Sequence, residues 1–197
     1  MGRRRFRRKT GNRQYRRMII ISTEGTVTEQ EYFNIFNSEN TVLHVKVLKD
    51  MASDPNNVLR RMKRYLDENP LQDKDQAWLV IDKDRWTDNQ IRPLYDWSRS
   101  LPKYGFALSN PKFELWLLLH FEDAKGIKSS RNCSERLERY LPGYNKKVEP
   151  LKISPYIQDA VDRAEKRDRP PCTDWPRTTG TTVYRLVKEL LKDAADS

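Results

Sequence analysis

The chain has 197 residues, of which 37% are hydrophobic, and its formal net charge is +10. This length predicts a single domain with a modest core. No run approaches the roughly 20 apolar residues of a membrane span, and no signal-peptide core is present. We therefore expect a soluble, cytoplasmic protein with no membrane partner, and we exclude the membrane-spanning and secreted classes.

The positive charge is concentrated at the amino terminus. Residues 1–17 hold eight arginines, one lysine and no acid, whereas the other 180 residues carry 29 bases and 28 acids. We interpret this segment as an arm that is disordered when free and that binds nucleic-acid phosphates. A mitochondrial presequence is less favoured, because clear amphipathic periodicity is missing. The basic residues of the arm are Arg3, Arg4, Arg5, Arg7, Arg8, Lys9, Arg13, Arg16 and Arg17.

The two cysteines give no sign of a metal site or a disulfide. Cys133 and Cys172 lie 39 positions apart, without CxxC or Cys/His ligand spacing. Two reduced thiols are therefore expected, and a zinc site is not.

Short apolar runs alternate with helical periodicity over the first 122 residues. The expected strands are 18–22, 41–48, 77–82 and 104–108, and the expected helices are 29–37, 55–68, 89–100 and 111–121. Thr28 and Glu31 predict a capping box for the first helix, and Asp54-Pro55 predicts the start of the second. Pro111 is expected to open the fourth helix. This β-α alternation predicts a parallel sheet with right-handed crossovers.

The pattern changes after residue 122. Residues 123–152 are polar, rich in lysine and interrupted by glycine and proline, with a short helix expected near 134–140. Helices are then expected at about 155–166 and 181–194. We therefore expect an α/β core of about four mainly parallel strands over 18–122. An irregular and helical extension, 123–197, should pack on this core.

Acidic residues follow three of the expected strands. Glu24 follows the apolar run 18–21, Asp82 and Asp84 close the run 78–81, and Glu114 lies just past Ser109-Asn110-Pro111. The carboxyl ends of parallel strands meet at one edge of a sheet, and Asp82 and Asp84 would share a side if the backbone stayed extended. Gathered carboxylates repel one another unless a cation offsets their charge. The sequence thus predicts a Mg²⁺ or Mn²⁺ site. Alternatively, Asp82 and Asp84 cap the helix expected at 89–100.

Several blocks of the sequence resemble known signatures. The order of an apolar strand, Glu24-Gly25, a second apolar strand and Asp82-x-Asp84 is similar to the Toprim domain of topoisomerases, primases and some nucleases. The segments EGTVTEQEYF (24–33), SNPKFELWLLLHF (109–121) and TTVYRLV (181–187) resemble the RloB-like family. This resemblance implies a Toprim/Rossmann-like fold and a metal-dependent endonuclease. It also implies a role in phage defence or abortive infection, beside an ATPase partner of the ABC/AAA type.

The resemblance assigns roles to five acidic positions. It makes Glu24 a general acid/base or metal ligand, and makes Asp82 and Asp84 metal ligands. It makes Glu29 a further catalytic or ligating acid, although an acid there also suits the start of a helix. Glu114 would complete a second metal site and act in catalysis, or would serve only as a helix-start acid.

Four further residues could contact a substrate. Arg85 and Trp86 follow the aspartate pair, and Trp86 either stacks on a base or covers the sheet edge. Lys146 and Lys147 either bind a phosphate or are simply solvated. Asn110 is expected to cap the helix that follows it, and it could also orient substrate or water.

The favoured hypothesis is a nuclease that cleaves DNA or RNA, with tRNA among the candidates. One alternative is a Toprim enzyme that processes structured RNA. The other is a non-catalytic adaptor that binds nucleic acid through its arm. The sequence does not predict the oligomeric state.

Overall fold

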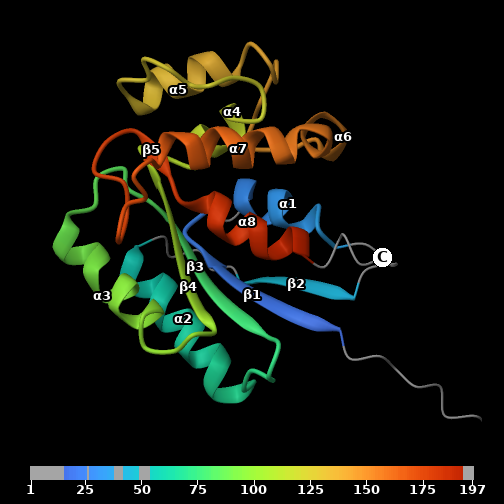
Figure 1. Cartoon of the computed structure of the whole chain (residues 1–197), viewed down its shortest axis with the longest axis vertical. Coiled ribbons are helices and arrows are strands. Elements are labelled where there is room, and N and C mark those ends of the chain that lie inside the picture. Colours follow the sequence, from blue (N-terminus) through green and yellow to red (C-terminus); the bar gives the residue numbers. More distant parts are fainter. Residues whose placement is uncertain (1–15, 26, 38–41, 49–53, 193–197) are drawn as a thin grey trace, which may run out of the picture.

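The computed structural model describes residues 16–25, 27–37, 42–48 and 54–192. The part of the basic arm from Arg3 to Arg13 lies outside these residues, so its expected binding role stays a prediction. The described residues form a five-stranded sheet with helices on both faces and a group of helices above one edge (Figure 1). No helix in the described ranges is both long enough and apolar enough to cross a membrane.

Four strands are parallel, as the alternation of elements predicts. They are β1 (Arg17–Thr23), β2 (Leu43–Leu48), β3 (Gln76–Asp82) and β4 (Tyr104–Asn110). A two-residue strand, β5 (Gly180–Thr181), pairs antiparallel with the end of β4, and the order is β2-β1-β3-β4-β5. β5 was not anticipated, because two residues carry no periodic signal. The fold class is confirmed as α/β.

The central strands β1, β3 and β4 are buried on both faces of the sheet because their middle residues are apolar, whereas the edge strand β2 exposes His44 and Lys46. Ile20 packs in a cluster with Val58 and Ile91, which belong to α2 (Pro55–Glu68) and α3 (Asp88–Ser98). Ile19 and Ile21 point to the other face, as alternation along a strand requires. That face is covered by α1 (Thr28–Asn34) and α8 (Val183–Lys192) (Figure 1).

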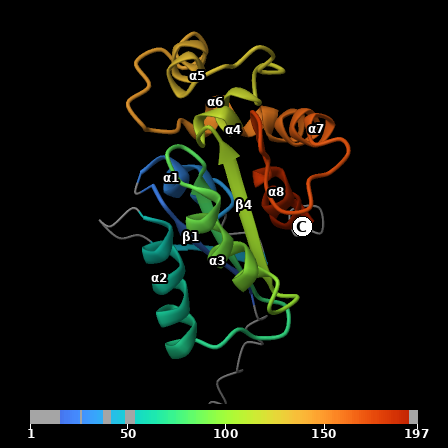
Figure 2. The same ribbon diagram turned by 90° about the vertical axis from the view of Figure 1, so that its left-hand side faces the viewer.

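The remaining helices lie beyond the carboxyl ends of the strands. β4 points toward α4 (Glu114–Leu118) and α5 (Ser130–Leu137), and α6 (Pro150–Ile153) and α7 (Ile157–Arg167) lie beside them (Figure 2). A short 3-10 helix, η1 (Ser154–Tyr156), joins α6 to α7. α6 was not anticipated. The carboxyl edge of the sheet is therefore enclosed by the part of the chain that follows β4.

Two helix starts agree with local sequence signals. The Asp54 side chain accepts a hydrogen bond of 3.1 Å from Asn57 N, so the expected cap of α2 is confirmed. α3 begins after Thr87, which forms a capping box with Gln90. The alternative role of Asp82 and Asp84 as caps of this helix is therefore wrong.

Two other helix starts differ from expectation. α1 has Val27 at its N-cap position without a side-chain bond, so the capping box of Thr28 and Glu31 is wrong. α4 begins at Glu114 rather than at Pro111. The Asn110 amide, expected to cap that helix, instead donates to the carbonyl of Pro176 at 3.1 Å. In each case the side chain expected to cap the helix forms a hydrogen bond with a residue that is distant in sequence instead.

The cap of α2 can be tested by mutation. Asp54→Ala removes the acceptor for the Asn57 N–H, so we expect the free energy of unfolding to fall by about 1 kcal/mol in urea denaturation. Asp67→Ala is the matched control, because Asp67 is an exposed acid at the other end of the same helix. An equal loss in both variants would contradict the capping role.

Candidate functional site

The ends of β1 and β3 bring two of the predicted acids together. Glu24 follows β1 directly, and its backbone N–H donates to the Val80 carbonyl of β3 at 3.1 Å. The Glu24 side chain accepts a hydrogen bond from the backbone N–H of Asp82, with 3.3 Å between Asp82 N and Glu24 Oε2. Parallel pairing therefore places Glu24 and Asp82 side by side at the carboxyl edge of the sheet.

Two further carboxylates come from the first turns of helices. Glu29 lies in the first turn of α1 and is 6% exposed, and Glu114 is the first residue of α4 and is half-buried. Glu24, Glu29, Asp82 and Glu114 all line one pocket of about 230 Å³. The structure thus gathers four of the five acids that the sequence singled out.

Gly25 is required by the close approach of Glu29. The Glu29 carboxylate accepts hydrogen bonds from the backbone N–H groups of Gly25 and of Glu29 itself. A Cβ added at Gly25 would overlap this carboxylate. The Glu-Gly pair is therefore a physical requirement, since a side chain at residue 25 would push Glu29 out of its place.

Burial and mutual repulsion favour the protonated forms of these acids. The pKa of Glu29 is raised to about 7, mainly by burial and further by the charges of Glu114 and Glu24, while its two backbone donors act to lower it. Burial also raises the pKa of Asp82 well above its usual range, with Glu29, Glu24 and Glu114 as the next causes. The pKa of Glu24 is raised mainly by burial. At neutral pH this pocket is a site of poorly compensated negative charge.

Few protein cations offset this charge. Lys146 lines the pocket, and Lys112 Nζ lies 3.9 Å from Glu114 Oε2 while it donates to Ser134 Oγ. Lys147 is exposed and does not line the pocket. Of the predicted lysine pair, the structure places only Lys146 against the acids.

Asp84 lies apart from the pocket lining. The strand ends at Asp82, and Asp84 adopts a φ of +26° in a turn, so the extended backbone expected through Asp84 is absent. Its side chain is exposed, although its charge raises the pKa of Glu24. A role for Asp84 as a metal ligand stays a prediction.

Trp86 makes a contact that the sequence did not reveal. Its indole N–H donates to Glu24 Oε1 at 3.0 Å, and the Arg85 guanidinium lies 4.9 Å from the centre of its ring. The indole therefore holds Glu24 in place from the side opposite the Asp82 backbone. No pattern in the sequence could show this contact, because the turn that brings Trp86 back toward β1 is irregular.

The loop between α5 and α6 forms one wall of the pocket. Thr28 Oγ1 shares a hydrogen bond of 3.0 Å with the Tyr144 hydroxyl and donates to the Lys146 carbonyl at 3.1 Å. Glu31 Oε2 accepts from Val148 N at 2.6 Å. These bonds fasten residues 144–148 to α1, and they explain why neither Thr28 nor Glu31 caps the helix.

The basic residues at the start of β1 lie far from the pocket. Arg17 is at the amino end of the strand, about 20 Å along it from Glu24. It donates to the Lys74 carbonyl and pairs with Glu189 of α8 at 3.3 Å. Arg17 therefore joins the sheet to α8, and Arg16 beside it is exposed.

The donor set suits a hard cation, although it does not form a complete coordination shell. Among the described residues, no three His, Cys, Asp or Glu side chains are placed to hold one metal ion together. Mg²⁺, however, commonly takes one or two carboxylates and completes its octahedron with water and substrate phosphate. Glu24 and Asp82, joined through a backbone hydrogen bond, could supply such a pair.

Removing the buried charge of Glu29 should stabilise the protein in the absence of divalent cations. With a folded pKa of about 7 against an ordinary 4.5, the ionised Glu29 lowers stability as pH rises through 7 and has no such effect below about 4.5. We expect Glu29→Gln to raise the free energy of unfolding by up to about 3 kcal/mol at pH 8.5, and by much less at pH 5.

Urea denaturation in EDTA at both pH values measures this difference. Glu135→Gln is the control, because Glu135 is an exposed acid of α5 whose ion pair with Arg131 is on the surface. A gain that is the same at pH 5 and pH 8.5 would contradict the buried-charge explanation.

The RloB-like protein family model matches residues 19–190. No curated protein and no solved structure matches the chain. The matched range includes the strand ends that carry Glu24 and Asp82 as well as the segment around Glu114. Because the match covers most of its length, the chain belongs to the RloB-like protein family.

Proposed function

We propose that this protein hydrolyses phosphodiester bonds in nucleic acid with Mg²⁺ or Mn²⁺ held at the acidic pocket. The observation that carries the proposal is the convergence of Glu24, Glu29, Asp82 and Glu114 on one pocket, where their charges are poorly offset. Such an arrangement is costly for folding, and a divalent cation with a bound phosphate would relieve that cost.

Glu24 and Asp82 would hold the cation, and Glu114 and Asp84 would extend the site toward a second ion. A bound cation would polarise the scissile phosphate and lower the pKa of a coordinated water. Glu29, which lines the pocket from α1, would accept the proton of the attacking water, with Glu24 as the other candidate. Trp86 would keep Glu24 oriented.

Basic groups around the pocket would bind the substrate backbone. Lys146 lines the pocket and is the lysine best placed to contact the phosphate being cleaved. Arg85 and Lys147 are exposed, so they would contact phosphates on either side. The arm, with its many arginines, would add affinity that does not depend on sequence and falls with rising salt.

Membership of the RloB-like family supports a wider biological proposal. The nuclease would act in phage defence through abortive infection, with an ATPase of the ABC/AAA type as its partner. An endonuclease without sequence-reading contacts would damage its own cell, so such a partner would restrain it until infection. DNA, tRNA and other RNA are all candidate substrates.

Replacing one central ligand tests the proposal. Asp82→Asn keeps the shape of the side chain but removes its charge, so we expect cleavage to fall at least 100-fold, with rates measured on plasmid, single-stranded DNA and total RNA in Mn²⁺. The ATPase partner should be added when the protein alone is inactive. Mn²⁺ affinity, measured by calorimetry without nucleic acid, should fall as well.

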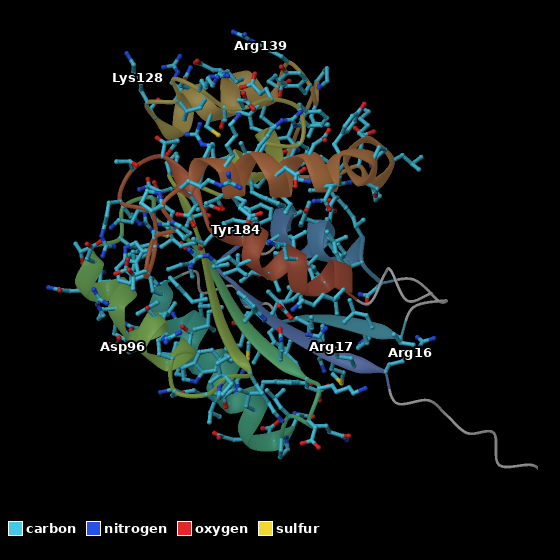
Figure 3. The ribbon with its side chains drawn as sticks, in the orientation of Figure 1. Arg16, Arg17, Asp96, Lys128, Arg139 and Tyr184 are labelled. Carbon is cyan, nitrogen blue, oxygen red and sulfur yellow. The ribbon has the colours of Figure 1, made fainter. Side chains whose placement is uncertain are left out.

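Asp96→Asn is the matched control, because Asp96 is an exposed aspartate on α3 (Figure 3) that does not line the acidic pocket. It should keep wild-type cleavage and Mn²⁺ affinity. Full cleavage by the folded Asp82→Asn protein would exclude a catalytic role for the pocket. Full cleavage together with unchanged Mn²⁺ binding would place the metal elsewhere.

A further inference from the structure

Outside the basic arm, the excess of positive charge lies in residues 123–152, between α4 and η1. Residues 123–152 hold eight bases and four acids, whereas residues 18–122 and 153–197 together hold 21 bases and 24 acids. Four bases of residues 123–152 form no ion pair with another described residue: Lys128, Arg139, Lys146 and Lys147. Lys128 and Arg139 point away from the molecule (Figure 3). This surface is suited to a polyanion.

Next to Arg139 the chain exposes an ordered group of aromatic rings that begins at Tyr140. Tyr140 stacks on Phe121 with a centroid distance of 5.0 Å and an interplanar angle of 4°, and Tyr156 lies 5.8 Å from Phe121. Tyr140 is 39% exposed and Tyr156 is 44% exposed. We call Phe121, Tyr140 and Tyr156 the aromatic platform.

The platform is ordered before any ligand binds. The Tyr140 hydroxyl donates to Glu122 Oε2 at 3.1 Å, and Glu122 is held by an ion pair with Arg136. Phe121 covers one face of the Tyr140 ring, and Tyr140 is still 39% exposed. A flat ring that is already fixed loses little side-chain entropy when a second flat ring stacks on it.

The platform is also connected to the acidic pocket. The chain runs from Tyr140 to Tyr144, which is fastened to Thr28, and on to Lys146, which lines the pocket. Six residues span at most about 22 Å. A nucleic-acid strand that lies in the pocket can therefore reach the platform within a few nucleotides.

We infer that the aromatic platform stacks on unpaired bases of the substrate while Arg139 and Lys147 bind the neighbouring phosphates. Open aromatic faces beside basic groups are typical of surfaces that bind single strands, because the bases of a duplex are stacked on one another and out of reach. The inference rests on the proposed function and specifies its substrate: single-stranded or looped nucleic acid rather than continuous duplex.

Binding experiments in EDTA test this inference without requiring cleavage. Fluorescence anisotropy would compare a labelled 20-nucleotide single strand with a blunt duplex of the same sequence, using the full chain at fixed salt. We expect Tyr140→Leu and Tyr156→Leu each to weaken single-strand binding about tenfold and duplex binding less than twofold. Tyr140→Phe keeps the ring and should bind within twofold of wild type.

The basic residues give a second, different signature. The double variant Arg139→Gln with Lys147→Gln should weaken both single strand and duplex, and should reduce the slope of log affinity against log salt by about 1 to 2. Circular dichroism and urea midpoints check that each variant is folded. If Tyr140→Leu does not fold, Tyr156→Leu decides the question, because no hydrogen bond of its side chain is lost.

Wild-type single-strand affinity in the folded Tyr140→Leu and Tyr156→Leu proteins would overturn the inference, and so would an equal loss on single strand and duplex. If these variants changed only self-association in sedimentation, the platform would be a contact between copies, which also overturns it. None of these results depends on catalysis. Asp82→Asn tests the proposed function separately, since it should abolish cleavage and leave the platform's preference for single strands intact.

Discussion

The constraint on which this structure depends is the desolvation of several carboxylates at one edge of the sheet. Glu29 and Asp82 are held where burial and neighbouring charges raise their pKa values. That arrangement lowers stability at neutral pH, so the surrounding structure must offset it. The apolar central strands, buried on both faces, provide the rigid frame. Backbone donors at Gly25 and Asp82 then hold the acidic side chains in place.

The fold was predictable where signals are local and was not where they depend on distant contacts. Continuous apolar runs predicted the four parallel strands, and Asp54-Pro55 predicted the start of α2 at the observed residue. The capping box predicted from Thr28 and Glu31 was wrong, because their partners Tyr144 and Val148 lie 116 and 117 residues further along the chain. β5 and α6 are too short to produce a periodic pattern.

The residues of the candidate site were also predictable only where the signal is local in the sequence. Glu24 and Asp82 could be identified from their positions after apolar runs, because parallel pairing brings such positions together. Glu29 needed the family resemblance, since an acid in the first turn of a helix is common for other reasons. Tyr144 and the role of Trp86 could not be found from the sequence, because irregular loops position both. The conformation of Asp84 likewise depends on where β3 ends.

The hydrogen bond from Trp86 to Glu24 gives the site an intrinsic optical reporter. An indole N–H and a metal cation are both electropositive, so they compete for the same carboxylate oxygen. Occupancy of Glu24 is thereby linked to the environment of the half-buried Trp86. Trp78 and Trp97 are also half-buried, but the Trp78 indole donates to Gln76 and Trp97 stacks on Tyr104, while Trp116 and Trp175 are fully buried. Emission from Trp86 should follow the filling of the pocket in real time, with no label attached.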